Sequence, residues 1–124
     1  MVLFNPAISI APDPRMTNGE QERLTTLAKR AGAPLKDISP LTHASRKQPP
    51  CIMFFGTEDP LLKGARFFRE DSKKAGNTCK LVTYKGQGHG FFNHGRNKGK
   101  YYQLTLAEMD RFFVELGWLT KTGS

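Results

Sequence analysis

Residues 51–60, CIMFFGTEDP, hold the clearest strand of this chain and an acidic residue just beyond it. Five consecutive apolar residues lie between Pro50 and Gly56, and such a run is typical of a parallel strand covered on both faces. Asp59 follows the carboxyl end of the run. Parallel sheets carry their functional groups beyond this end, so the stretch predicts an α/β fold with Asp59 at its functional edge.

Two further apolar runs predict the neighbouring strands. Residues 2–4, VLF, indicate a buried strand that passes into a loop at Asn5-Pro6. Residues 79–84, CKLVTY, indicate the next strand, and His89 lies just beyond its carboxyl end. Because helical segments separate the strands, we expect a three-stranded parallel sheet with right-handed crossovers and flanking helices.

The segment between the first two strands is predicted to hold one helix and a linker. Thr17 and Glu20 have the spacing of a capping box, which predicts a helix over residues 18–31 that ends at Gly32. The positions expected to face inward on this helix are Leu24, Leu27 and Ala28. Residues 33–50 contain Pro34, Pro40, Pro49 and Pro50 and few apolar positions, so we expect a linker with one short helix near residues 39–41.

Two more helices follow the second and third strands. Amphipathic patterns predict the first over residues 63–75, closed by Gly76, and the second over residues 100–116. The positions expected to be buried are Ala65, Phe68, Ser72, Leu104, Met109, Phe112, Phe113 and Leu116.

Asp59 and His89 have the residue types of a catalytic acid and base on consecutive strands. A carboxylate that accepts the Nδ1 proton of an imidazole fixes its tautomer and stabilises the imidazolium formed in catalysis. Alternatives remain open: Asp59 could cap the next helix, Glu58 could replace it as the acid, and His89 could be a plain loop histidine. The spacing of Gly86, Gly88 and Gly90 does not match a phosphate-binding loop.

Residues 49–92 resemble the carboxyl-terminal part of α/β-hydrolases of the esterase/lipase and dienelactone-hydrolase-like kind. In those enzymes a Gly-Thr-x-Asp step carries the catalytic acid and a Gly-His-Gly-Phe step carries the catalytic histidine, which implies these roles for Asp59 and His89. Residues 2–6 are similar to the strand after the family's nucleophile helix, and residues 13–48 resemble its cap insertion. The resemblance implies that residues 1–124 form the carboxyl-terminal portion of an α/β-hydrolase domain, a partial α/β-hydrolase fold.

The same resemblance implies a serine-type hydrolase of small-molecule carboxylic esters that needs no metal or organic cofactor. However, no serine of this chain lies in a G-x-S-x-G elbow; the serines are Ser9, Ser39, Ser45, Ser72 and Ser124. We therefore expect the nucleophile and the oxyanion hole upstream of Met1. Loss of a nucleophile costs about a millionfold in turnover, so the chain alone is expected to be nearly inactive.

Two other functions stay open on the sequence. The chain could be a noncatalytic α/β module that dimerises or binds a partner through an uncovered sheet edge near residues 2–4. It could also be part of a prolyl-oligopeptidase-like peptidase, because that family shares the acid and the histidine.

Composition and charge exclude several classes of function. No run approaches the length of a membrane span, and residues 1–6 lack the basic start of a signal peptide, which leaves the compartment open. The net charge is +8, but the basic residues are dispersed. The densest cluster, Arg96, Lys98 and Lys100, lacks interleaved aromatic residues, so we expect no nucleic-acid partner.

Cys51 and Cys79 are too few and too far apart in sequence for a zinc pattern. Both open apolar runs, so we expect buried thiols at the amino ends of their strands. A disulfide would require the two strands to be neighbours.

Overall fold

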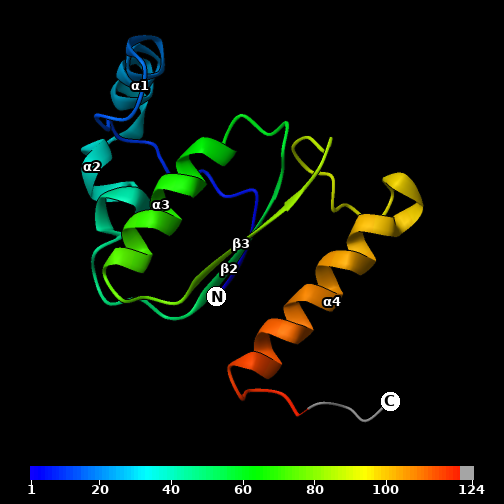
Figure 1. Cartoon of the computed structure of the whole chain (residues 1–124). Coiled ribbons are helices and arrows are strands. Elements are labelled where there is room, and N and C mark those ends of the chain that lie inside the picture. Colours follow the sequence, from blue (N-terminus) through cyan, green and yellow to red (C-terminus); the bar gives the residue numbers. More distant parts are fainter. Residues whose placement is uncertain (121–124) are drawn as a thin grey trace.

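A computed structural model describes residues 1–120 of the chain (Figure 1). Along the sequence the elements are β1 (Val2–Phe4), α1 (Asn18–Ala31), α2 (Leu35–Ile38), η1 (Pro40–His43), β2 (Cys51–Gly56), α3 (Leu62–Lys74), β3 (Cys79–Tyr84), η2 (Asn97–Gly99) and α4 (Lys100–Glu115). The predicted strands and the three longer helices are confirmed, each within one residue of its expected bounds.

The three strands form one parallel sheet in the order β1-β2-β3. In the register, Val2 pairs with Ile52 and Gly56 pairs with Tyr84. The predicted three-stranded parallel sheet is thus correct. Since the strands are parallel and consecutive strands are neighbours, the loops that follow them lie together at the carboxyl end of the sheet.

The central strand β2 is buried on both faces, as its continuous apolar run predicts. Met53 and Phe55 belong to the same apolar cluster as Phe68 of α3. Phe54 on the opposite face belongs to a second cluster with Phe112 of α4. The two helices accordingly cover opposite faces of the sheet (Figure 1).

Strand β1 is only half-buried, so the expectation of a buried strand was wrong. Its exposure increases toward its end, where Phe4 is 36% exposed. Within residues 1–120, β1 pairs on one side only, with β2, and this single neighbour leaves its other edge uncovered.

Helix α1 begins and ends where predicted, but its expected inward face was wrong. Thr17 and Glu20 form the capping box, and Gly32 takes the left-handed conformation with φ of 67°. No residue of α1 is buried, and Leu27 is 39% exposed. The helix projects beyond the sheet, so no layer covers its apolar stripe (Figure 1).

Of the other positions expected to be buried, half are buried, and Met109, Phe113 and Leu116 are partly buried against the cluster around Phe112. Ala65, Phe68 and Ser72 are buried on α3. On α4, Phe112 is buried, whereas Leu104 is 40% exposed because the side of the helix turned to the sheet carries Thr105 instead. The short helix expected near residues 39–41 is η1.

Helix α2, which was not predicted, precedes η1 in the linker. Its Leu35 and the Leu41 of η1 are both buried. Leu41 belongs to the same apolar cluster as Phe68, so this part of the proline-rich linker packs onto the domain.

The two cysteines face each other at the amino ends of β2 and β3. Cys51 and Cys79 are partners in the register, and their Sγ atoms lie 3.3 Å apart as free thiols. Contact with the Cys51 thiol and then burial raise the pKa of Cys79. The expectation of buried thiols is confirmed. Within residues 1–120, no helix combines the length and hydropathy that crossing a membrane requires.

Candidate active site

Asp59 is fixed in the loop between β2 and α3. Its side chain is fully buried, and Oδ1 accepts the backbone N–H of Leu61 at 2.9 Å. Its backbone carbonyl accepts the N–H of Leu62, the first residue of α3, at 3.1 Å. The residue therefore orders the start of α3, and this role leaves its second carboxylate oxygen, Oδ2, for another partner.

His89 supplies that partner. Its Nδ1 lies 3.0 Å from Oδ2 of Asp59, although the two residues are 30 positions apart in the sequence. The His89 side chain is 60% exposed, in contrast to the buried carboxylate. Within residues 1–120 its other ring nitrogen, Nε2, makes no hydrogen bond. The imidazole thus faces a buried carboxyl group on one side, and its other side is exposed.

Backbone hydrogen bonds hold the acid loop against the histidine loop. Thr57 N–H donates to the Tyr84 carbonyl and Glu58 N–H donates to the Gln87 carbonyl, both at 3.0 Å. The Thr57 hydroxyl accepts the Gly86 N–H at 2.9 Å. The threonine two residues before the acid therefore has a structural role, because its hydroxyl joins the two loops.

Gly56 is required by the close approach of these loops. A Cβ atom built on Gly56 would lie 1.9 Å from the carbonyl oxygen of Gln87. In the histidine loop, Gly86 and Gly90 have φ of 70° and 74°, in the region that favours glycine. The glycines around His89 therefore serve backbone shape and loop packing.

A third strand contributes Asn5, which the sequence analysis did not identify as a site residue. Asn5 is 5% exposed, follows β1 directly, and has a left-handed φ of 45°. Its side-chain amide donates to Asp59 Oδ2, and its Oδ1 accepts the Gly90 N–H at 3.4 Å. The signal in the sequence was a polar residue before a proline, at the same strand end as the predicted pair.

The alternative residues lie elsewhere. The Glu58 side chain is exposed and is not hydrogen-bonded to His89. Ser39 is buried, and its hydroxyl bonds the carbonyl of Ile8 at 3.2 Å, while Ser45 is exposed. Neither approaches His89 by a hydrogen bond, and Ser124 lies outside the described residues. Both cysteines open their strands, at the opposite end from Asp59 and His89.

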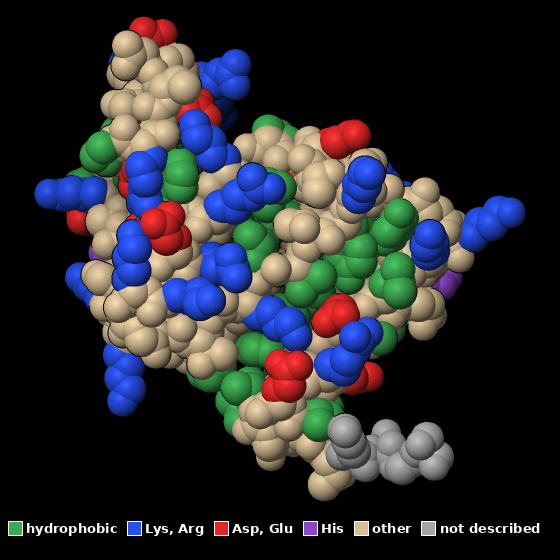
Figure 2. Space-filling view, in the orientation of Figure 1, with side chains coloured by type: hydrophobic (Ala, Val, Ile, Leu, Met, Phe, Trp, Pro, Cys, Tyr) green, Lys and Arg blue, Asp and Glu red, His purple; other side chains and the backbone are tan. Residues whose placement is uncertain are grey.

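No cluster of three or more potential metal ligands occurs within residues 1–120. The basic residues Arg96, Lys98 and Lys100 are exposed, and Arg96 donates to the His89 carbonyl at 3.1 Å. On the face drawn in Figure 2, Lys and Arg side chains are scattered, with acidic side chains among them.

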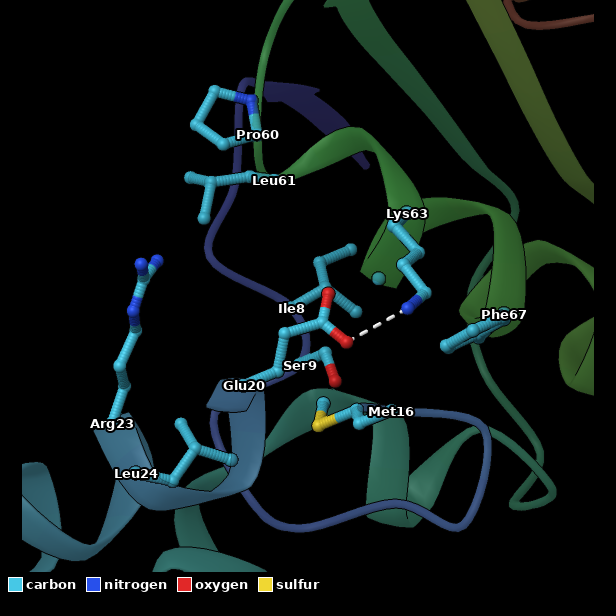
Figure 3. A pocket seen from close by; sticks show the side chains of 11 residues that line it. Ile8, Ser9, Met16, Glu20, Arg23, Leu24, Pro60, Leu61, Lys63 and Phe67 are labelled. Atoms are coloured by element: carbon cyan, nitrogen blue, oxygen red, sulfur yellow. Dashed lines mark hydrogen bonds and ion pairs between the residues drawn. The ribbon is translucent and has the colours of Figure 1, made fainter. Parts of the chain in front are cut away.

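A cavity of about 170 Å³ lies between α1 and α3 (Figure 3). Its lining includes Met16 and Leu24 on one side and Leu61 and Phe67 on the other. Glu20 and Lys63, 2.8 Å apart, point toward each other across it. Asp59 and His89 do not line this cavity, although Pro60 and Leu61, which follow Asp59, do.

Comparison with known proteins also indicates an α/β-hydrolase. Residues 8–93 match the family model described as alpha/beta hydrolase fold. The chain is 40% identical to the native thermophilic esterase 2 of Thermogutta terrifontis, with a TM-score of 0.85 over 99% of this chain and 44% of the esterase.

Two further structures of esterase 2 from Thermogutta terrifontis match similarly. The propionate-bound form is 41% identical with a TM-score of 0.84, over 98% of this chain and 44% of the other. The form phosphonylated by sarin is 39% identical with a TM-score of 0.82, over 98% and 45%.

The chain therefore spans less than half the length of these esterase structures. A search of the curated proteins finds no match. The family model nevertheless covers more than half of the chain, on the same sheet that carries Asp59 and His89. This chain belongs to the α/β-hydrolase fold family.

Proposed function

We propose that this chain supplies the acid, Asp59, and the histidine, His89, of a serine-type carboxylic ester hydrolase. The observation that carries the proposal is the hydrogen bond from the exposed imidazole to the buried carboxylate at 3.0 Å. Identity of about 40% to an esterase over nearly the whole chain supports the choice of ester hydrolysis. The serine lies outside these 124 residues in this proposal.

His89 would act through Nε2, the ring nitrogen on its exposed side. In the first step it takes the serine hydroxyl proton as the serine oxygen bonds to the acyl carbon, and Asp59 stabilises the resulting imidazolium. The imidazolium then protonates the alkoxide as the bond from the acyl carbon to the alcohol breaks. Water repeats the sequence on the acyl-enzyme, releasing the carboxylic acid and restoring the serine.

The substrates we propose are small-molecule esters of short carboxylic acids. Structures of the Thermogutta esterase are described with bound propionate and butyrate and with organophosphorus adducts such as that of sarin. A peptidase of the prolyl-oligopeptidase kind would use the same pair, but the similar structures are those of an esterase.

Residues 13–48 are proposed to be the cap of this hydrolase. They leave the core between β1 and β2, and their longest helix, α1, has no buried residue. The cavity in Figure 3 separates α1 from α3, so this helix adds nothing to the core, whereas Leu41 and Ala44 near the end of the segment pack into it. We expect no metal, organic cofactor or nucleic-acid partner to take part.

The test uses the extended reading frame that contains this chain and a G-x-S-x-G elbow upstream. Hydrolysis of p-nitrophenyl butyrate is measured for that complete hydrolase and for the His89→Ala variant. We expect a loss of turnover of about a millionfold, as for removal of a catalytic histidine elsewhere. His94→Ala is the matched control, because His94 is an exposed histidine of the same loop that stacks edge-on against Tyr102. Unchanged hydrolysis in His89→Ala would overturn the assignment.

A second candidate function is a noncatalytic module that associates through β1. The uncovered edge of that strand and the exposed Phe4 ring favour it. Sedimentation of the 124-residue chain distinguishes the two, since a monomer at high concentration would contradict self-association.

A further inference from the structure

Asn5 is carried to the site by the backbone at the end of β1. Its N–H donates to the Phe54 carbonyl at 3.0 Å, which extends the pairing of β1 with β2 by one residue. Its φ of 45° lies in the left-handed region, which asparagine tolerates better than most residues. The side chain is buried beside Asp59 and not exposed on the edge of the sheet.

The amide of Asn5 can make its contacts in one orientation only. Its Nδ2 donates to Asp59 Oδ2, and its Oδ1 accepts the N–H of Gly90. Rotation of the amide by half a turn would set its oxygen against a carboxylate oxygen and its N–H against another N–H. Each contact therefore requires the same orientation of the Asn5 amide as the other.

Asp59 needs this contact to keep one oxygen toward the histidine. The Leu61 N–H holds Oδ1, and the Asn5 amide holds Oδ2, the same oxygen that faces His89 Nδ1. With both oxygens held, rotation of the carboxylate would break these hydrogen bonds. The contact to Gly90 also joins β1 to the residue directly after His89.

We propose that Asn5 is a positioning residue of the hydrolase, which aligns the Asp59 carboxylate and the His89 loop with each other. This inference rests on the proposed function, because it assigns to Asn5 a role in placing the catalytic pair. It adds a third strand to the site, so that β1, β2 and β3 each contribute one residue at their carboxyl ends.

Two substitutions separate the contacts of Asn5. Asn5→Asp keeps the size and the acceptor for Gly90 but replaces the donor to Asp59 by a second carboxylate oxygen. Asn5→Gly removes both contacts and relieves the left-handed backbone. Asn97 offers matched controls, because it has a similar φ of 50°, is exposed, and donates to Gln87 instead of Asp59.

The first measurement needs no serine and uses the 124-residue chain. Ring ¹⁵N chemical shifts of His89 report which nitrogen carries the proton in the neutral imidazole. We expect the Nδ1–H form in the parent and a lower fraction of it in Asn5→Asp and Asn5→Gly, with Asn97→Asp and Asn97→Gly unchanged. Retention of the parent tautomer in both Asn5 variants would overturn the proposal, as would unfolding of both, which would make Asn5 a structural residue.

The second measurement uses the complete hydrolase. Misplacement of catalytic groups by about 1 Å can cost about a hundredfold, so we expect kcat to fall by about that factor in Asn5→Asp while KM stays within twofold. A loss confined to thermal stability, with kcat unchanged, would overturn the role of Asn5 but leave the esterase assignment intact. Absence of ester hydrolysis in the parent would overturn the proposed function, and the ¹⁵N shifts would still decide whether Asn5 aligns the pair.

Discussion

The loops at the carboxyl ends of the strands and the α1 region, residues 13–31, are held in place by different kinds of contact. All six residues of β2 are buried, whereas none of the fourteen residues of α1 is. Around Asp59 the loops are joined by backbone hydrogen bonds and by van der Waals contact at Gly56. The α1 region, in contrast, depends on the capping box of α1 and on exposed ion pairs such as Arg15–Asp71 at 2.7 Å.

This difference indicates where sequence changes should be tolerated. Core packing resists changes of a single methyl group, whereas exposed ion pairs contribute little and weaken with salt. We therefore expect a steep gradient of effects from the strand ends to α1.

After the loss of His89 itself, the largest effect is expected at the carboxylate. In the complete hydrolase, Asp59→Asn should lower kcat by about ten-thousandfold, because an amide at this position favours the wrong tautomer of His89. Steady-state ester hydrolysis measures it. Glu58→Gln, which changes the exposed neighbour, should retain the parent rate. A drop in Glu58→Gln equal to that in Asp59→Asn would contradict the choice of acid.

The packing of the two loops is tested next by Gly56→Ala. The added Cβ would clash with the Gln87 carbonyl, and overpacking of this kind costs up to about 3 kcal/mol. Urea unfolding of the 124-residue chain gives the free energy of unfolding. Gly88→Ala is the control, because a Cβ there meets nothing within 4 Å. Equal stability of the two variants would show that the loops are not in close contact.

On the other side of the comparison, Thr17→Ala removes the side chain that caps α1. We expect a loss of about 1 kcal/mol, typical of an N-cap, confined to α1. Hydrogen exchange should show faster exchange of α1 amides and unchanged exchange in β2. Thr25→Ala, a change at an exposed position within α1, should not accelerate exchange. If Thr17→Ala also loosened β2, α1 would unfold together with the core.

The smallest effect is a pH dependence at the same cap. The hydrogen bond from Lys63, followed by that from the Thr17 backbone, lowers the pKa of Glu20 from 4.5 to about 2. Because the pKa is lower in the folded state, Glu20 stabilises the cap above pH 4.5 and loses this contribution as the pH falls toward 2. The protection factors of α1 amides, which correct for the intrinsic pH dependence of exchange, should therefore fall in acid, and less so in Glu20→Gln.

Glu22→Gln changes an exposed carboxylate of the same helix and serves as the control for this acid effect. It should keep the parent response to acid. The same loss of protection in Glu20→Gln as in the parent would assign the response to another group.

The sequence predictions were more accurate for the strands and their ends than for the α1 region. The burial of residues 51–55 could be predicted because the run is apolar throughout. The pairing of Asp59 with His89 could be anticipated because both follow consecutive strands. The inward face of α1 could not, because a helical period shows an apolar stripe but not whether another layer covers it. The prediction that Leu104 is buried was wrong for the same reason.

Asn5 was missed because its contacts depend on the meeting of three strands. Its neighbours in the sequence, Phe4 and Pro6, indicate a strand end and a turn. Only the order β1-β2-β3 places its amide beside Asp59 and Gly90.

The bond between Asn5 and Gly90 spans 85 positions of the sequence. It can close only when β1 and β3 have both paired with β2, because β2 lies between them. A chain in which only β2 and β3 have paired can bring Asp59 and His89 together but lacks the Asn5 contact. The Nδ1–H tautomer of His89 should accordingly reach its native fraction only when all three strands have docked, which makes the His89 ring signals a reporter of complete folding in refolding experiments.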